Sequence, residues 1–170
     1  MTRQVEPRAW LRWLFTGALI AGTCDITYAI TSSFLRRGVA PSRVLQSVAS
    51  GALGRSAYDG GAATAALGLG FHYLFAFSFT CAFFLAASRF AGLTRRPIAT
   101  GAVYGVGIFA VMNYIVIPLS RIGPRPIPPM VVLVPEVLVH MFFIGVPIAL
   151  AARRAFGRAR SSPLVGAPAY

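Results

Sequence analysis

The stretch MVVLVPEVLVHMFFIGVPIALAA, residues 130–152, decides the fold class of this chain. Apart from Glu136 and His140 it is apolar, and it exceeds the roughly 20 residues that an α-helix needs to cross a hydrocarbon core about 30 Å thick. A helix is expected because lipid offers no partners for backbone polar groups, which must therefore bond within the segment. The carboxylate, the imidazole and the two prolines, Pro135 and Pro147, are features that a simple membrane anchor does not need.

The whole chain shares this apolar character. Of its 170 residues, 56% are hydrophobic and only 12% are charged, whereas soluble domains carry about 25% charged residues. Four stretches are apolar and long enough to be membrane spans, at about 13–32, 62–88, 98–119 and 130–152. The sequence therefore predicts an all-α polytopic membrane protein, with one four-helix transmembrane bundle at 13–152 between basic segments at 1–12 and 153–170.

The first connection between spans contains a further helical pattern. In PSRVLQSVASGALG, residues 41–54, apolar residues recur at helical spacing and Arg43 and Gln46 lie on the opposite side. Gly54 suits the end of such a helix. We therefore expect a short amphipathic helix at about 41–53, lying flat at the outer membrane interface.

The positive charge points to the membrane surface. The net charge is +12, and all sixteen basic residues are arginines. They gather at span ends without a basic stripe or a nucleic-acid recognition motif, which favours contacts with anionic lipid headgroups over nucleic acid. Ten arginines fall on the side of the two termini and six on the other side. The positive-inside rule then predicts cytoplasmic termini, in a bacterial inner membrane.

Each predicted span carries polar residues within its apolar run. On the first span, Asp25 shares a face with small residues such as Ala21 and Gly22, while Leu19, Ile20, Ile26 and Ile30 are expected to point towards lipid. Helical rise places the polar residues at similar depths, in the central or outer part of the membrane. The candidate buried polar site consists of Asp25, His72, Asn113, Glu136 and His140.

Two interpretations of this polar layer remain open. It is either a structural network of hydrogen bonds between helices or a functional site for protons, a cation or a small ligand, since ionisable groups inside spans usually have a function. Metal or haem ligation by His72 and His140 is an alternative, although no ligand motif supports it and no cofactor is the main expectation. Cys24 and Cys81 lack CxxC spacing and are expected to be buried thiols.

Three segments together carry a family resemblance: LQSVASGALGRSAYDGGAATAALGLGFHYLFAF, GAVYGVGIFAVMNYIVIPLS and HMFFIGVPIALAARR. In these segments the chain resembles small uncharacterised bacterial four-span membrane proteins, similar in layout to the YagU-like inner-membrane proteins. The match runs from the first span to Arg154. The resemblance implies an inner-membrane location and assigns no catalytic residue.

The sequence favours a non-enzymatic protein, because it contains no nucleophile elbow, P-loop or dinucleotide-binding fingerprint. The main hypothesis is an inner-membrane protein with a buried polar site. A haem- or metal-binding redox subunit and a structural or assembly subunit without a site are the alternatives. Stripes of small residues, such as Gly101-x-x-x-Gly105, favour close packing of the spans into a compact bundle. A homo-oligomer and an unknown membrane partner both stay open.

Overall fold

A computed structural model describes residues 7–157, and its four long helical segments confirm the all-α fold predicted from the sequence. No strand occurs in this range. The predicted basic segments fall partly outside it, at residues 1–6 and 158–170. The first span is α1 (Pro7–Arg37), the second is α3 (Gly61–Arg89), the third joins α4 (Pro97–Val111), η3 (Met112–Val116) and α5 (Ile117–Leu119), and the fourth joins α6 (Met130–Val139), η4 (His140–Gly145) and α7 (Val146–Gly157).

Short helices fill two of the connections. The predicted helix at 41–53 is present as α2 (Pro41–Leu53), which has a proline at its start and ends at Gly54, where φ is +68°. Positive φ is the conformation that glycine adopts without strain. The turn η1 (Gly54–Tyr58) follows α2, and η2 (Ala91–Thr94) joins α3 to α4. The position of α2 at the membrane interface stays a prediction.

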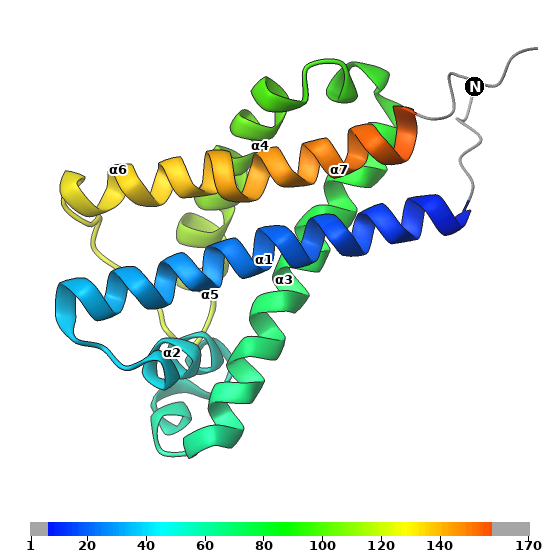
Figure 1. The fold of residues 1–170 in the computed structure, drawn as a ribbon. Helices are drawn as coiled ribbons and strands as arrows, with labels where there is room; N and C mark the ends of the chain where they lie inside the picture. The colour runs from blue at the N-terminus through cyan, green and yellow to red at the C-terminus, as the bar shows by residue number, and fades with distance from the viewer. Residues whose placement is uncertain (1–6, 158–170) are drawn as a thin grey trace, which may run out of the picture.

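The helices form a bundle whose two ends differ (Figure 1). α1 and the α6–α7 segment lie side by side, and α3 crosses them obliquely. The start of α1, the end of α7 and η2 lie at one end, called here the terminal end, while α2 and the connection at 120–129 lie at the other, called the α2 end. At the terminal end Arg12 and Arg154 both lie over the ring of Trp13, at 5.5 and 5.3 Å from its centroid.

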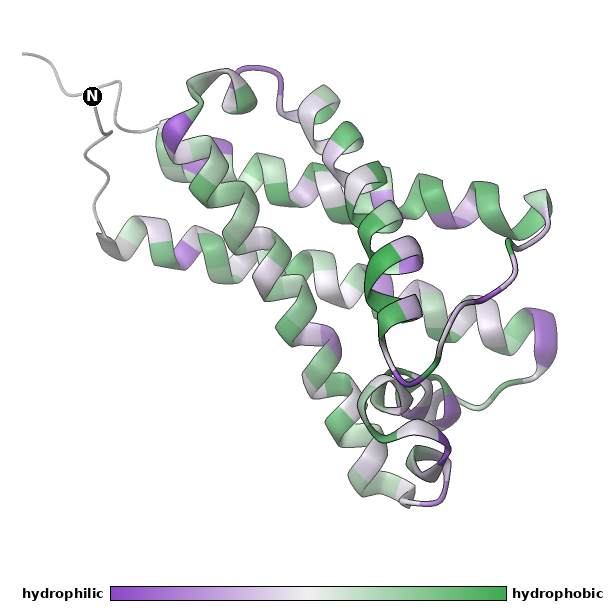
Figure 2. Cartoon of the chain, turned by 180° about the vertical axis from the view of Figure 1, so that it is seen from behind, coloured by the Kyte–Doolittle hydropathy of each residue, from purple (hydrophilic) through white to green (hydrophobic). Residues whose placement is uncertain are grey.

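Apolar side chains cover much of the outside of the bundle. Leu19, Leu74, Leu85, Val103 and Phe143 are all more than half exposed, and hydrophobic residues dominate the long helices whereas hydrophilic ones gather at connections and helix ends (Figure 2). In water such a surface would be a large unsatisfied patch. With four helices long and apolar enough to cross a bilayer, the chain is a membrane protein whose outer face suits lipid.

The third and fourth spans approach closely because of glycines. A Cβ atom at Gly105 would overlap the backbone carbonyl of His140, and one at Gly145 would overlap that of Gly101. These three glycines are buried. The predicted Gly101-x-x-x-Gly105 stripe is thus the contact surface of α4 with η4, where backbones meet without intervening side chains.

Both of these spans contain a π-helical turn just before a proline. η3 precedes Pro118 and η4 precedes Pro147. Proline cannot donate to the carbonyl four residues earlier and clashes with it, and a wider turn relieves that clash within a continuous helix. The distortion before Pro147 is therefore a π turn, and it begins at His140.

One predicted helix face is partly wrong. Leu19 and Ile20 are exposed as expected, but Ile26 is only 7% exposed and faces the interior. Ile26 lies one helical turn after the buried Gly22, so the two residues share a face of α1. The lipid-facing stripe of α1 is consequently narrower than the sequence pattern indicated.

Candidate functional site

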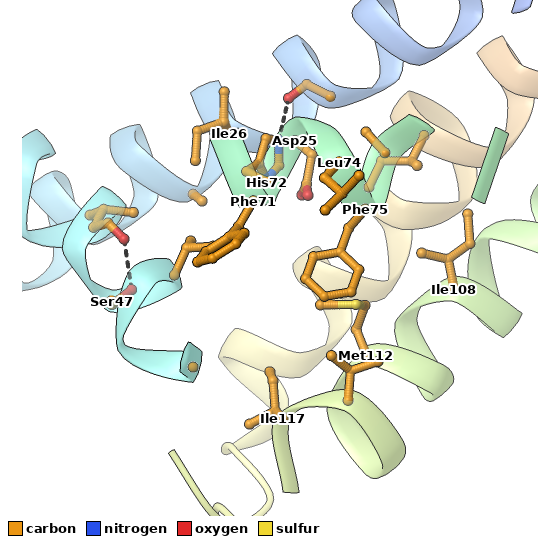
Figure 3. A pocket seen from close by; sticks show the side chains of 18 of the residues that line it. Asp25, Ile26, Ser47, Phe71, His72, Leu74, Phe75, Ile108, Met112 and Ile117 are labelled. Carbon is orange, nitrogen blue, oxygen red and sulfur yellow. Dashed lines mark hydrogen bonds between the residues drawn. The ribbon is translucent and has the colours of Figure 1, made fainter. Parts of the chain in front are cut away.

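A cavity of about 550 Å³ lies between all four spans. Its wall takes residues from α1, α2, α3, α4, η3, α5, η4 and α7, together with the connection after α5. Ligand pockets typically have volumes of roughly 300–1,000 Å³ and mostly apolar walls. Aromatic and aliphatic side chains form most of this wall, among them Phe71, Phe75, Ile108 and Met112 (Figure 3).

Three of the five predicted polar residues line this cavity. Asp25 comes from α1, His72 from α3 and His140 from the first position of η4. Residues from three different spans therefore surround the same space, and Figure 3 draws Asp25 and His72 among the residues that line it. All three side chains are partly buried.

A hydrogen bond between helices holds His72. Its Nε2 atom lies 2.8 Å from the carbonyl oxygen of Gly22 on α1 (Figure 3). α3 can approach this closely because Gly22 has no side chain, and a Cβ atom there would lie 3.0 Å from the ring of Tyr73. Tyr73 adds a second link between the helices, since its hydroxyl lies 2.9 Å from that of Thr23.

His140 is held from within its own helix. Its Nδ1 atom lies 2.8 Å from the carbonyl oxygen of Glu136, one turn earlier. Its ring packs edge-on against Phe109, with 5.3 Å between the centroids. The carbonyl of Glu136 is free to accept this bond in addition to the helical one because an oxygen has two lone pairs.

The two hydrogen bonds assign the proton in each imidazole. A carbonyl oxygen can only accept, so Nε2 of His72 and Nδ1 of His140 must donate. In the neutral ring the remaining nitrogen, Nδ1 of His72 or Nε2 of His140, is then an acceptor. Among residues 7–157 neither nitrogen has a partner, nor has the carboxylate of Asp25, and none of these atoms is sealed from contact. Each of these three residues of the cavity wall therefore keeps an acceptor without a hydrogen-bond partner among the described residues.

Glu136 and Asn113 do not line the cavity. The amide of Asn113 lies in the π turn η3 and donates to the carbonyl oxygen of Phe109 on its own helix, at 3.0 Å. Glu136 is partly buried, and the charges of Arg36, His140, Arg37 and Asp25 act on it. The structure thus places Asp25, His72 and His140 on the cavity wall. Glu136 lies outside the wall but within electrostatic range of Asp25 and His140, and Asn113 does not join them.

The structure provides few candidate ligands for the alternative of a metal site. Among residues 7–157 no three or more His, Cys, Asp or Glu side chains form a group able to hold a metal ion. Cys24 and Cys81 are unpaired and partly buried, one on α1 and one on α3. The described part of the cavity offers a metal the carboxylate of Asp25 and two histidines, each of which has one nitrogen already bonded to a carbonyl.

Several residues of the cavity were not predicted from the sequence. Its α2 end is bordered by polar and charged side chains, namely Ser33, Arg37, Ser47, Ser120 and Arg125. From the sequence, these arginines indicate topology and contacts with anionic lipid headgroups, but not a pocket. Their positions at the end of a span and in a proline-rich connection were visible, but the sequence does not show that α2 packs between them.

No family model, no curated protein and no solved structure matches the chain.

Proposed function

We propose that this chain is a bacterial inner-membrane protein, with cytoplasmic termini, that binds a small and largely apolar ligand in the cavity between its spans. The observation that carries the proposal is the meeting of Asp25, His72 and His140 around one cavity of about 550 Å³. The resemblance to small four-span inner-membrane proteins and the excess of arginines at the terminal end support the location.

The residues of the cavity wall indicate which chemical groups the ligand carries. Asp25 and the free imidazole nitrogens of His72 and His140 are acceptors, so a complementary ligand carries a hydrogen-bond donor, such as a hydroxyl or amine. The surrounding wall, with Phe71, Phe75 and Met112, is apolar and favours a hydrocarbon body. The cavity is far larger than a proton or a single cation requires, which favours a small organic ligand among the three possibilities.

The test is to purify the full chain in nanodiscs of zwitterionic lipid and to identify bound small molecules by native mass spectrometry. We expect an organic molecule bound at one per chain. Ala29→Phe, which places a ring in the cavity, should abolish its binding, whereas Thr27→Phe on the exposed side of the same helix should not. Equal occupancy in both variants, or a wild-type chain without any ligand, would contradict the proposal.

A visible spectrum of the same sample separates the redox alternative. A Soret band or stoichiometric metal that disappears in both His72→Gln and His140→Gln would replace the proposed function with that of a haem- or metal-binding subunit. A colourless sample that carries the organic ligand would support the proposal as stated.

A further inference from the structure

A second pocket, of about 400 Å³, adjoins the α2 end of the cavity and is rich in arginine. Arg37 comes from the last turn of α1, Arg43 from the first turn of α2 and Arg125 from the connection before α6. No acidic side chain from the described residues lines it. We call this space, lined by the three arginines, the arginine pocket.

The arginines retain most of their hydrogen-bonding capacity. Arg43 donates to the carbonyl oxygen of Tyr58 at 2.9 Å and lies 5.6 Å from the centroid of its ring. Arg37 reaches the hydroxyl of Ser33 at 3.4 Å, and Arg125 makes no hydrogen bond within residues 7–157. Because a guanidinium has five N–H donors, these contacts leave many donors free. The charge of Glu136 acts on Arg37, which still leaves the pocket with a net positive charge.

The arginine pocket and the apolar cavity adjoin each other. Arg37, Arg125, Ser33 and Ser47 line both spaces. All three arginines lie at helix ends or in a connection, where headgroups meet the chain, while the cavity extends from there between the spans. Cationic donors at the surface and an apolar chamber below them match a molecule with an anionic head and a hydrocarbon tail.

We propose that the ligand of this protein is a single-chain amphiphile with an anionic carboxylate or phosphate head, which the arginine pocket binds, and with a chain that enters the cavity and carries there the hydroxyl or amine that Asp25, His72 and His140 can bind. Simple chains without that donor test the head and the hydrocarbon part of such a ligand. This inference rests on the proposed function and names the class of its ligand. A guanidinium binds both head groups well because its parallel N–H donors match two oxygen atoms.

The experiment measures binding of dodecanoate, dodecanol and inorganic phosphate to the full chain in zwitterionic nanodiscs. Dodecanol keeps the chain without the charge, and phosphate keeps the charge without the chain. The test variant combines Arg37→Gln, Arg43→Gln and Arg125→Gln. Its control combines Arg55→Gln and Arg121→Gln, which remove exposed charges from the same end but outside the pocket.

We expect dodecanoate to bind to the wild-type chain at least about tenfold more tightly than dodecanol, and to lose at least about tenfold in affinity in the triple variant but not in the control. Ala29→Phe should weaken dodecanoate as well, because the tail needs the cavity. Thermal unfolding of each variant shows that the comparison is made on folded protein.

Other outcomes overturn the inference in distinguishable ways. If Ala29→Phe blocks dodecanoate binding but the triple variant does not, the arginine pocket does not bind the head group, and the proposed function still stands. Phosphate binding as tight as that of dodecanoate, with no effect of Ala29→Phe, would show a site for a free anion. A chain that carries its organic ligand yet binds no dodecanoate would refute the amphiphile alone.

Discussion

His72 on α3 donates a hydrogen bond from Nε2 to the backbone carbonyl oxygen of Gly22 on α1, over 2.8 Å. This bond joins two spans at the wall of the cavity and leaves the other imidazole nitrogen free to accept. One side chain thereby fixes the spacing of the helices and supplies an acceptor to the cavity. In a structural role, a replacement for His72 must donate a hydrogen bond to Gly22. In a binding role, it must also keep an acceptor for the ligand.

We expect His72→Phe to lower the free energy of unfolding by about 0.6 kcal/mol and by no more than about 1.7 kcal/mol, the mean and the maximum measured for hydrogen bonds between membrane helices. His72→Gln should recover part of this loss, because its amide can donate to Gly22. Reversible unfolding in detergent measures both. Tyr73→Phe is the comparison, since it removes a bond to the exposed Thr23 and should cost less. Wild-type stability in His72→Phe would show that the bond does not join the helices.

The glycines of the third span provide a matched pair of substitutions. Gly105→Ala should destabilise the protein by about 1–3 kcal/mol or more, because its Cβ atom would overlap the backbone carbonyl of His140. Gly107 has no neighbour within 4 Å of a Cβ position. Gly107→Ala should therefore be neutral or stabilise the helix by up to about 1 kcal/mol.

Thermal unfolding of the two alanine variants checks this prediction, and ligand occupancy adds a second readout. Gly105→Ala should also reduce occupancy of the cavity, since it displaces the backbone that carries the His140 side chain. If both variants behave alike, the close contact of α4 with η4 is not formed.

The fold could be predicted because its signals are local. The apolar runs marked all four spans, and Pro41 and Gly54 bracketed α2 at its observed ends. The helices extend beyond the predicted runs, as α1 does from Pro7 to Arg37, since hydropathy marks only the part of a helix that lies in hydrocarbon. Arginines at the span ends stay helical outside it.

The site was only partly predictable, because it depends on helix phase and on packing between distant segments. Asp25 and His72 could be placed towards the interior from the small residues that share their faces. Asn113 follows the stripe of Gly101 and Gly105, but its amide bonds the carbonyl of Phe109 on its own helix, a local partner that helical spacing does not reveal. Arg43 and Arg125 lie in one pocket because distant segments pack together, and no periodic pattern in the sequence indicates that packing.

The orientation of the chain is tested by labelling cysteines. In a background with Cys24→Ser and Cys81→Ser, we expect Ser42→Cys at the start of α2 to react with a membrane-impermeant maleimide in intact cells. Gly92→Cys in η2 should react only after lysis, because the excess of arginines predicts that this end lies in the cytoplasm. Both positions are exposed. The opposite labelling pattern would show that the topology is the reverse of the predicted one.

The carboxylate of Asp25 has no hydrogen-bond partner among residues 7–157 and lies in a membrane span. A charge in that position is costly for folding, and residues retained for binding often reduce stability. We therefore expect Asp25→Asn to raise the melting temperature while it weakens ligand binding by about tenfold, through loss of a charged acceptor. Asp59→Asn, at an exposed turn, is the control and should change neither quantity. Melting curves and native mass spectrometry on the same samples measure the two effects together.

A structural role of Asp25 predicts the reverse pattern. If the carboxylate stabilised the packing of the helices, the variant would melt at a lower temperature while its ligand occupancy stayed unchanged. That pattern would leave the polar layer as a helix-packing feature and remove Asp25 from the proposed site.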